Sequence, residues 1–472
     1  MNGAEALADA GFPIGETSDS PHSSHRSRST GLGAVGGGGP VATTAAAADA
    51  TTPFRPHRPR LYCERWTVLV GYCALVMAAQ VTFVLTLPVA EKMASFYGVS
   101  APLMDALALA FVVSYAPAMV WVPWVLTRME LYRALLLGAS LQCLGAWLSV
   151  GGRAPGGVAF VALGHTLAAA GGPLVMNCLA TVPQMWFGTH ERPLATALGY
   201  IASVVGVGGG IMLSVALTPD AGSVPSALLA SGGIVTALLV GFLLLFRRRP
   251  WSPPTGSAAT QLEDERLRAG GRPWAPPPHA PVPPASCSAL GAAARDVRWA
   301  SCAVSYSLVA GTVLAWARVG GRLMRATGHG DEFTAGLGIL FLASGIVGTI
   351  VAALVVGFVF AFKRVLGALG AAAAMSACLF AWQVRVGLGG GGGGGAHTAP
   401  AQVYPDAGLN AEDALNVLVC CVGFALMPLA PVALELCAET AYPTREFTST
   451  GALRVCVRAS AAGMRVSAHA HG

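Results

Sequence analysis

The chain has 472 residues, of which 54% are hydrophobic and only 11% are charged, and its net charge is +6. Soluble domains carry about 25% charged residues, so this deficit excludes an ordinary soluble protein and indicates one embedded in a lipid bilayer. The modest positive charge forms no clustered basic stripe, which argues against a nucleic-acid partner and suits basic loops beside a membrane.

The first 60 residues are rich in Ala, Gly, Ser, Thr and Pro, and their only aromatic residues are Phe12 and Phe54. Such a segment cannot bury enough apolar surface to offset the entropy lost on ordering, so we expect residues 1–60 to form a disordered cytoplasmic tail. It lacks the basic start and apolar core of a secretory signal. An organelle-targeting peptide is the alternative.

Long apolar stretches fill most of the remaining chain. About 20 apolar residues suffice to cross the roughly 30 Å hydrocarbon core as a helix. Six candidate spans precede a polar segment rich in proline, and four follow it. The spans cover residues 66–90, 104–126, 134–150, 157–186, 194–217, 226–246, 299–320, 333–360, 365–384 and 414–438. We therefore predict a first bundle of six helices over 61–249, a cytoplasmic linker over 250–298 and a second, incomplete bundle over 299–451.

The last residues, 452–472, are too polar to cross a bilayer, since Arg454, Arg458 and Arg465 follow one another closely. We expect them to be a tail unrelated to the bundles, with the last two helices of the second bundle missing from this chain.

The basic residues of the short loops predict the orientation. If the N-terminus is cytoplasmic, three groups of basic residues fall on the cytoplasmic side of the membrane. They are Arg128 with Arg133, Arg247 to Arg249, and Lys363 with Arg364. Positive loops favour the cytoplasm, so this orientation is predicted. The plasma membrane is the expected location, and an internal organelle membrane is the alternative.

The predicted order is six helices, a polar cytoplasmic linker and a second set of helices. This is the layout of a major facilitator superfamily transporter, in which the substrate site lies between two bundles. Shorter stretches between Arg65 and Gly451 resemble one branch of that superfamily, the family of the feline leukaemia virus subgroup C receptor. The most specific is the run from Glu435 to Gly451. The others are Phe96-Tyr97-Gly98-Val99, Ser114-Tyr115-Ala116-Pro117, Leu144-Gly145-Ala146-Trp147, Trp186-Phe187-Gly188 with Glu191-Arg192, and Thr334-Ala335-Gly336.

This resemblance implies an all-α membrane protein with two six-helix bundles that exports haem or carries choline and ethanolamine. Where choline-transporting members have a tryptophan in the first helix, this chain has Phe83. A glutamine of their fourth helix falls on Gly172, and an aromatic of their seventh helix falls on or beside Trp316.

Polar and aromatic residues inside the apolar spans are the candidates for substrate contact, because burying them in lipid is costly. Aromatic rings could hold an organic cation by cation–π contact. His165 and Asn177 are twelve positions apart and should share roughly one helix face. For each candidate the alternative is ordinary helix packing or hydrogen bonding. The candidates are Gln80, Phe83, Tyr115, His165, Asn177 and Trp316.

Charged residues near the span ends are candidates for gating or for proton or ion coupling. They are Asp105, Arg318, Glu435 and Glu439. Asp105 opens a predicted helix, where a carboxylate also has a purely structural benefit. Glu435 and Glu439 lie one turn apart, so each could raise the pKa of the other. Pairing with arginines is the structural alternative for these two.

No nucleophile–base constellation, nucleotide motif or metal-ligand spacing of cysteines and histidines is present in the sequence. We therefore expect no catalytic residues, no metal, no cofactor and no enzyme activity. The sequence predicts a multi-pass transporter that moves a small organic solute, such as a choline-like cation, haem or a vitamin-sized molecule, by alternating access. A membrane receptor without transport, or an inactive truncated transporter, is the alternative.

Overall fold

The computed structural model describes residues 62–86, 88–100, 115–251, 331–389 and 411–440, together with positions 103, 104, 107, 113, 253–255, 258, 262, 304 and 324. All of them belong to the second of two units into which the chain divides, which begins at His57. The predicted tail 1–60, the span 299–320, most of the linker 250–298 and the residues after 440 lie outside this description.

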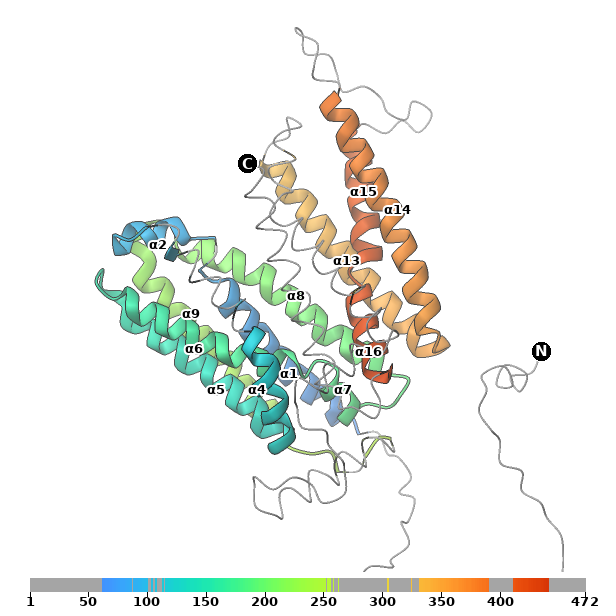
Figure 1. Ribbon diagram of the computed structural model, residues 1–472, viewed down its shortest axis with the longest axis horizontal. Helices are drawn as coiled ribbons and strands as arrows, with labels where there is room; N and C mark the ends of the chain where they lie inside the picture. The colour runs from blue at the N-terminus through green and yellow to red at the C-terminus, as the bar shows by residue number, and fades with distance from the viewer. Residues whose placement is uncertain are drawn as a thin grey trace, which may run out of the picture. The chain divides into compact units, whose positions relative to one another are not determined.

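The regular elements of the described residues are helices throughout, which confirms the all-α prediction (Figure 1). The N-terminal half contains α1 (Glu64–Val84), α2 (Ala90–Tyr97), α4 (Tyr115–Arg128), α5 (Leu131–Val150), α6 (Val158–Met176), α7 (Thr181–Trp186), α8 (Arg192–Leu217) and α9 (Val224–Leu245). The C-terminal half contains α13 (Asp331–Val359), α14 (Phe362–Gly389), α15 (Ala411–Leu426) and α16 (Leu429–Thr440). Two single 3₁₀ turns, Gly151–Arg153 and Ala221–Ser223, join α5 to α6 and α8 to α9.

Eight helical segments in the described part of the chain are long and apolar enough to cross a bilayer. They are Glu64–Val84, Leu131–Arg153, Val158–Met176, Arg192–Leu217, Ala221–Leu245, Glu332–Val359, Phe362–Arg385 and Glu412–Cys437. Each coincides with a span predicted from hydropathy, so the prediction of a multi-pass membrane protein is confirmed.

Prolines divide spans that hydropathy alone presents as continuous. The predicted span 157–186 breaks between α6 and α7, four residues before Pro183, and the span 414–438 breaks at Pro428. A proline ring clashes with the carbonyl four residues earlier and donates no hydrogen bond. Likewise α1 ends at Val84, short of the predicted end at 90, because Pro88 has no N–H to donate to the carbonyl four residues earlier.

In the N-terminal half, α1 packs against α6, α8 and α9, and α5 lies along α6 (Figure 1). Tyr72 of α1 is fully buried and donates a 2.9 Å hydrogen bond from its hydroxyl to the Val175 carbonyl. The α5–α6 contact depends on glycine, because a Cβ on Gly145 would overlap the Gly164 carbonyl oxygen and lie 2.7 Å from the Ala168 nitrogen. Small residues let helix backbones approach closely in lipid.

In the C-terminal half, α15 packs against both α13 and α14 (Figure 1). Glycine again permits the approach, since a Cβ on Gly348 of α13 would overlap the Phe424 carbonyl of α15, and one on Gly423 would overlap the Phe341 carbonyl. Both halves are therefore built on the same kind of close helix contact.

The two ends of the N-terminal half differ in chemistry. At the end that carries α2, the Tyr97 hydroxyl donates a 2.6 Å hydrogen bond to the Gly152 carbonyl, and Lys92 donates one of 2.7 Å to the Thr218 carbonyl. Burial raises the pKa of Tyr97 to about 12, so it remains a hydrogen-bond donor at physiological pH. Gly98 ends α2 in the left-handed conformation with φ 64°, which glycine adopts without strain. At the opposite end Arg65 pairs with Glu191, Arg247 with Glu64, and Arg249 with Glu130. Arg153 lies at the end that carries α2.

Candidate functional site

The two halves meet where α8 packs against α13 and α16. At this contact the Thr196 hydroxyl of α8 donates a hydrogen bond to the Glu435 carboxylate of α16. Thr196 is fully buried and Glu435 is 2% exposed. A hydrogen bond in a buried environment is stronger than one in water, so this pair is a polar link between the halves. The predicted candidate Glu435 is thus placed at a contact between the halves.

A small cavity adjoins this pair and is shared by the two halves. It is lined by Pro193, Ala197, Thr349, Ala353, Val356, Phe362, Pro431, Val432 and Glu435. The Thr349 hydroxyl bonds to the Gly345 carbonyl of its own helix at 2.7 Å. The wall is therefore mainly apolar around one carboxylate, which strengthens the electrostatic interactions of that carboxylate.

A second contact between the halves joins the α7–α8 turn to the α13–α14 turn. His190 Nδ1 lies 3.1 Å from the Gly357 carbonyl oxygen, and the imidazole packs edge-on against Phe360 with ring centroids 4.6 Å apart. Phe360 has φ 52°, a left-handed conformation that a bulky residue rarely adopts. The turn between α13 and α14 is therefore held in a conformation that costs backbone energy, directly against the other half.

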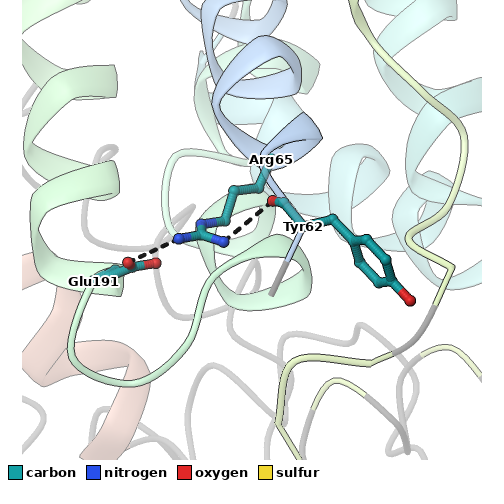
Figure 2. Close-up of polar contacts among 3 residues, drawn as sticks. All are labelled: Tyr62, Arg65 and Glu191. Atoms are coloured by element: carbon teal, nitrogen blue, oxygen red, sulfur yellow. Dashed lines mark hydrogen bonds and ion pairs between the residues drawn. The ribbon is translucent and has the colours of Figure 1, made fainter. Parts of the chain in front are cut away.

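Next to these contacts, α1 is tied to the start of α8 (Figure 2). Arg65 Nη2 donates a 2.9 Å hydrogen bond to Glu191 Oε1, and Nη1 donates one of 3.1 Å to the Tyr62 carbonyl. The Arg65 guanidinium also lies 5.9 Å from the ring centroids of Trp66 and Phe187, which pack edge-to-face. This ion pair orders the turn that carries His190.

Replacing Arg65 with glutamine should lower the unfolding midpoint clearly, because the Arg65 side chain is only 13% exposed and its loss leaves the Glu191 carboxylate without its cation. A charged hydrogen bond contributes about 1.5–3 kcal/mol. Arg247→Gln is the matched control, since its 3.3 Å pair with Glu64 is about half exposed on both sides and exposed pairs contribute about 0–1 kcal/mol. Thermal unfolding in detergent measures both, and equal losses would contradict this account.

His165 lies inside the N-terminal half and not between the halves. It lines a cavity among α1, α5, α6 and α9, together with Thr82, Thr86, Ser149 and Ser231. About 20 Å³ of this cavity is open to the centre of a water molecule, which is room for one water. Three of the four hydroxyls bond to carbonyls of their own helices at 2.7–3.0 Å. The fourth hydroxyl, that of Thr86, has no hydrogen-bond partner among the described residues. It is therefore available to bind a water molecule in the cavity.

The other substrate-binding candidates are separated from this cavity. Gln80 donates a hydrogen bond to the Ser203 hydroxyl and so joins α1 to α8. Phe83 is half-buried in the last turn of α1. Asn177 is buried, but it follows the end of α6, and its backbone N–H bonds to the Pro173 carbonyl. His165 lines the cavity and Asn177 does not. Asn177 keeps helical backbone, but twelve residues at about 100° each place the two side chains about 120° apart around the helix axis, so they do not share one face.

The remaining candidates are placed only in part. Tyr115 begins α4 and Glu439 lies in the last turn of α16, and their side chains are outside the described part of the structure. Asp105, Trp316 and Arg318 are outside it altogether.

Sequence reasoning missed several buried polar residues. The hydroxyls of Thr196 and Ser203 form hydrogen bonds with the candidates Glu435 and Gln80. Gln142 and Gln184 lie within apolar helices and are 0% and 3% exposed. Neither side-chain polar atom of Gln142 has a hydrogen-bond partner among the described residues. An isolated amide in an apolar span was a signal that could have found Gln142 and Gln184. The two hydroxyls carry no comparable signal, because serine and threonine are common in membrane helices.

Comparisons with known proteins agree on the fold. The chain resembles FucP, a major facilitator superfamily transporter solved in the outward conformation, with TM-score 0.55 and 14% identity over 84% of this chain and 90% of that chain. It also resembles a bacterial homologue of the iron transporter ferroportin in the outward-facing state, with TM-score 0.57 and 12% identity over 86% of this chain and 91% of that chain. No family model matches the chain.

Sequence comparison gives a more specific relationship. The choline/ethanolamine transporter FLVCR2 of Homo sapiens is 24% identical over 299 residues, which are 61% of this chain and 53% of that protein. The choline/ethanolamine transporter flvcr2b of Danio rerio is 21% identical over 414 residues, 85% of this chain and 76% of that protein. The chain thus spans about half the length of the human relative. It has the fold of the major facilitator superfamily, and it is similar in sequence to the FLVCR choline/ethanolamine transporters.

Proposed function

We propose that this protein is a membrane transporter that moves a small organic cation of the choline or ethanolamine type by alternating access between its two halves. The observation that carries the proposal is the buried contact between Thr196 and Glu435, which joins the halves at one end of a major facilitator fold. In such folds the halves rock against each other around a site near the middle of the membrane. A polar link at one end is what closes that end.

The contacts at this end act together in the proposed cycle. The Thr196–Glu435 pair and the His190 contacts with Gly357 and Phe360 must separate before a solute can leave on this side. Because the loops here carry the excess of arginine, this side is cytoplasmic in the proposed orientation, with the N-terminus in the cytoplasm and the protein in the plasma membrane. A solute would then enter from the opposite side while these contacts are formed.

The substrate class is proposed from the relatives and from the residues of α1. A quaternary or primary ammonium is held by aromatic faces and by polar groups that orient it. Phe83 supplies a half-buried ring one turn from Gln80, whose amide is fixed by Ser203. Tyr115, Asn177 and Trp316 are the further candidates for substrate contact. His165, which lines a cavity with room for one water, is a candidate for moving a proton within the N-terminal half.

A series at Phe83 tests the substrate class. Phe83→Leu keeps the apolar bulk and removes the ring, so the KM for radiolabelled choline should rise about 2- to 30-fold, which is the loss of one cation–π contact of about 0.5–2 kcal/mol. Phe83→Trp should keep or lower the KM, since tryptophan has the strongest ring. Uptake into proteoliposomes that contain the full chain measures both.

Three outcomes separate the competing functions. Choline or ethanolamine flux that depends on the ring at Phe83 supports the proposal. Saturable choline binding without flux indicates a receptor on the same fold. Equal flux in the leucine and tryptophan variants would show that Phe83 does not contact the substrate, and would argue against recognition by this aromatic ring.

A further inference from the structure

A second small cavity adjoins the one that contains His165, toward the end of the N-terminal half that carries α2. The cavity around His165 is named the inner cavity, and this second one the outer cavity. The outer cavity lies between α2, the ends of α1 and α8, and the start of α9, and its lining includes Met93, Ser214 and Thr218. About 20 Å³ of it is open to the centre of a water molecule, so it too has room for one water.

A single layer of side chains separates the two cavities, because Leu85, Thr86 and Leu228 line both of them. Thr86 is 6% exposed, and its hydroxyl has no hydrogen-bond partner among the described residues. Leaving a buried hydroxyl without a partner is unfavourable. Since Thr86 adjoins both cavities, its hydroxyl is placed to bond to a water molecule in either one and to connect the two.

The other hydroxyls of the inner cavity present acceptor oxygens to it. Thr82, Ser149 and Ser231 each donate their hydrogen to a carbonyl of their own helix. A hydroxyl oxygen that has donated its hydrogen can still accept one from another molecule. The wall therefore favours a guest that donates hydrogen bonds and is no larger than water, which describes water itself and its protonated form.

His165 is the titratable group of the inner cavity within the described part of the chain. The lining residues that α1, α5 and α9 contribute are apolar or carry hydroxyls. Charged residues at the α2 end belong to neither lining, and Lys92 there donates a 2.7 Å hydrogen bond to the Thr218 carbonyl. These charged residues are Glu91, Lys92, Arg153 and Asp220. A proton that enters the inner cavity thus meets one side chain that can hold it.

A second unpartnered polar side chain lies just beyond the inner cavity. Gln142 precedes Gly145 and Ser149 by three and seven positions, so it shares the face of α5 that lines this cavity. It is 0% exposed, and neither of its side-chain polar atoms has a hydrogen-bond partner among the described residues. Buried polar groups are nearly always bonded to protein or to ordered water. Thr86 and Gln142 therefore both indicate water, one on each side of the inner cavity.

We propose that the outer cavity, Thr86 and the inner cavity form a water path from the α2 end of the N-terminal half to His165, along which protons reach the imidazole. A proton arrives on a water molecule, passes to the unprotonated nitrogen of the ring and leaves that water neutral. Ionisable side chains inside membrane helices commonly serve in such relays. The path lies within one half, away from the contact of Thr196 with Glu435, so it stands whether or not the protein transports choline.

Hydroxyl-radical footprinting of the purified full chain in detergent tests for water in the path, because radicals formed from bound water oxidise the side chains beside it. Met93 lines the outer cavity and is 3% exposed. Met185 is 2% exposed in the core cluster around Tyr72 and lines neither cavity. Peptide mass spectrometry should find Met93 and His165 oxidised and Met185 protected. Protection of all three would show that the cavities are dry and would overturn the proposal.

Thr86→Val tests the junction, since valine keeps the shape of threonine and removes the hydroxyl. Oxidation of His165 should fall about 2- to 12-fold, which is the loss of one hydrogen bond to water, while Met93 stays unchanged on the outer side. Thr166→Val is the matched control, because the exposed Thr166 hydroxyl bonds to the Ala162 carbonyl of its own helix. Equal effects of the two variants would contradict the role of Thr86. A fall at Met93 without one at His165 would mean that water enters from the opposite end.

Exchange of the His165 C2 hydrogen with deuterium tests the proton step, because this hydrogen exchanges only through the protonated imidazole. Its rate, followed by peptide mass spectrometry over a pH series, should trace a sigmoidal curve in wild type and in Thr166→Val and should be slower in Thr86→Val. A rate that does not respond to pH, in a protein whose Met93 is oxidised, would show that the path holds water but delivers no proton to His165, and would overturn the proposal.

Discussion

Replacing Gly145 with leucine should abolish the folded N-terminal half. Any Cβ at this position overlaps the carbonyl oxygen of Gly164, and the neighbouring Ala168 nitrogen leaves no room for the side chain to turn aside. The clash is with backbone, which cannot change rotamer, so α5 and α6 must separate along their length. Overpacking of a core costs about 1–3 kcal/mol, and a backbone clash lies at or above the upper end of that range. Fluorescence-detected gel filtration in detergent measures the loss as a fall in monodisperse protein.

Gly233→Leu is the control for this substitution. Gly233 lies on α9, is exposed, and has no atom within 4 Å of a Cβ built on it, so a leucine there faces only lipid or detergent. We expect this variant to behave as wild type in gel filtration and thermal unfolding. If Gly145→Leu were as monodisperse as Gly233→Leu, the α5–α6 contact would not be as close as described.

Thr196→Val should open the contact between the two halves. Valine has the shape of threonine but removes the hydroxyl that donates to Glu435, and it leaves that carboxylate buried without this donor. A hydrogen bond contributes about 0.5–1.5 kcal/mol, so the population of the open form should rise about 2- to 12-fold. Cys437 can report the change, because it is 0% exposed in an apolar cluster with Leu434 and Val356, and Tyr200 of α8 packs against this cluster. Its reaction with a thiol reagent, quantified by peptide mass spectrometry, should accelerate in the variant.

Two controls separate opening from unfolding. Cys178 is also 0% exposed but lies inside the N-terminal half, so its labelling should stay unchanged in Thr196→Val. Thr166→Val removes an exposed hydroxyl that bonds only to the Ala162 carbonyl of its own helix, at 2.8 Å, and should leave both cysteines as in wild type. Acceleration at both cysteines would indicate general destabilisation, and none at Cys437 would show that Thr196 does not hold the halves together.

Hydropathy was sufficient to predict the number and approximate position of the described membrane spans. A continuous apolar run in α13 or α9 leaves no other structure that satisfies its backbone in lipid. Hydropathy did not locate the breaks before Pro183 and at Pro428, because the residues around them stay apolar. The prolines themselves were the available signal for those breaks.

The site was harder to predict than the fold. A polar residue in an apolar span indicates that a hydrogen-bond partner is buried beside it, but does not indicate which residue that partner is. Glu435 was recognised as a candidate, but its partner Thr196 is 239 positions away, and no local pattern links the two. The prediction that His165 and Asn177 share one face does not hold, because twelve residues at about 100° each leave the two side chains about 120° apart around the axis of α6. Partners across helices depend on which helices are neighbours, and this information is tertiary.

The two broken spans occupy matching places, since each is the fourth predicted span of its half. In both, a long segment is followed by a short one, α7 or α16, and both short segments pack against α8. Transporter folds are commonly built from internal repeats, and breaks at matching places are what such a repeat would give. Amide hydrogens at the two breaks should therefore exchange with deuterium at similar rates, and both faster than those in the middle of α6, because a short helix can unfold without disturbing its long neighbour.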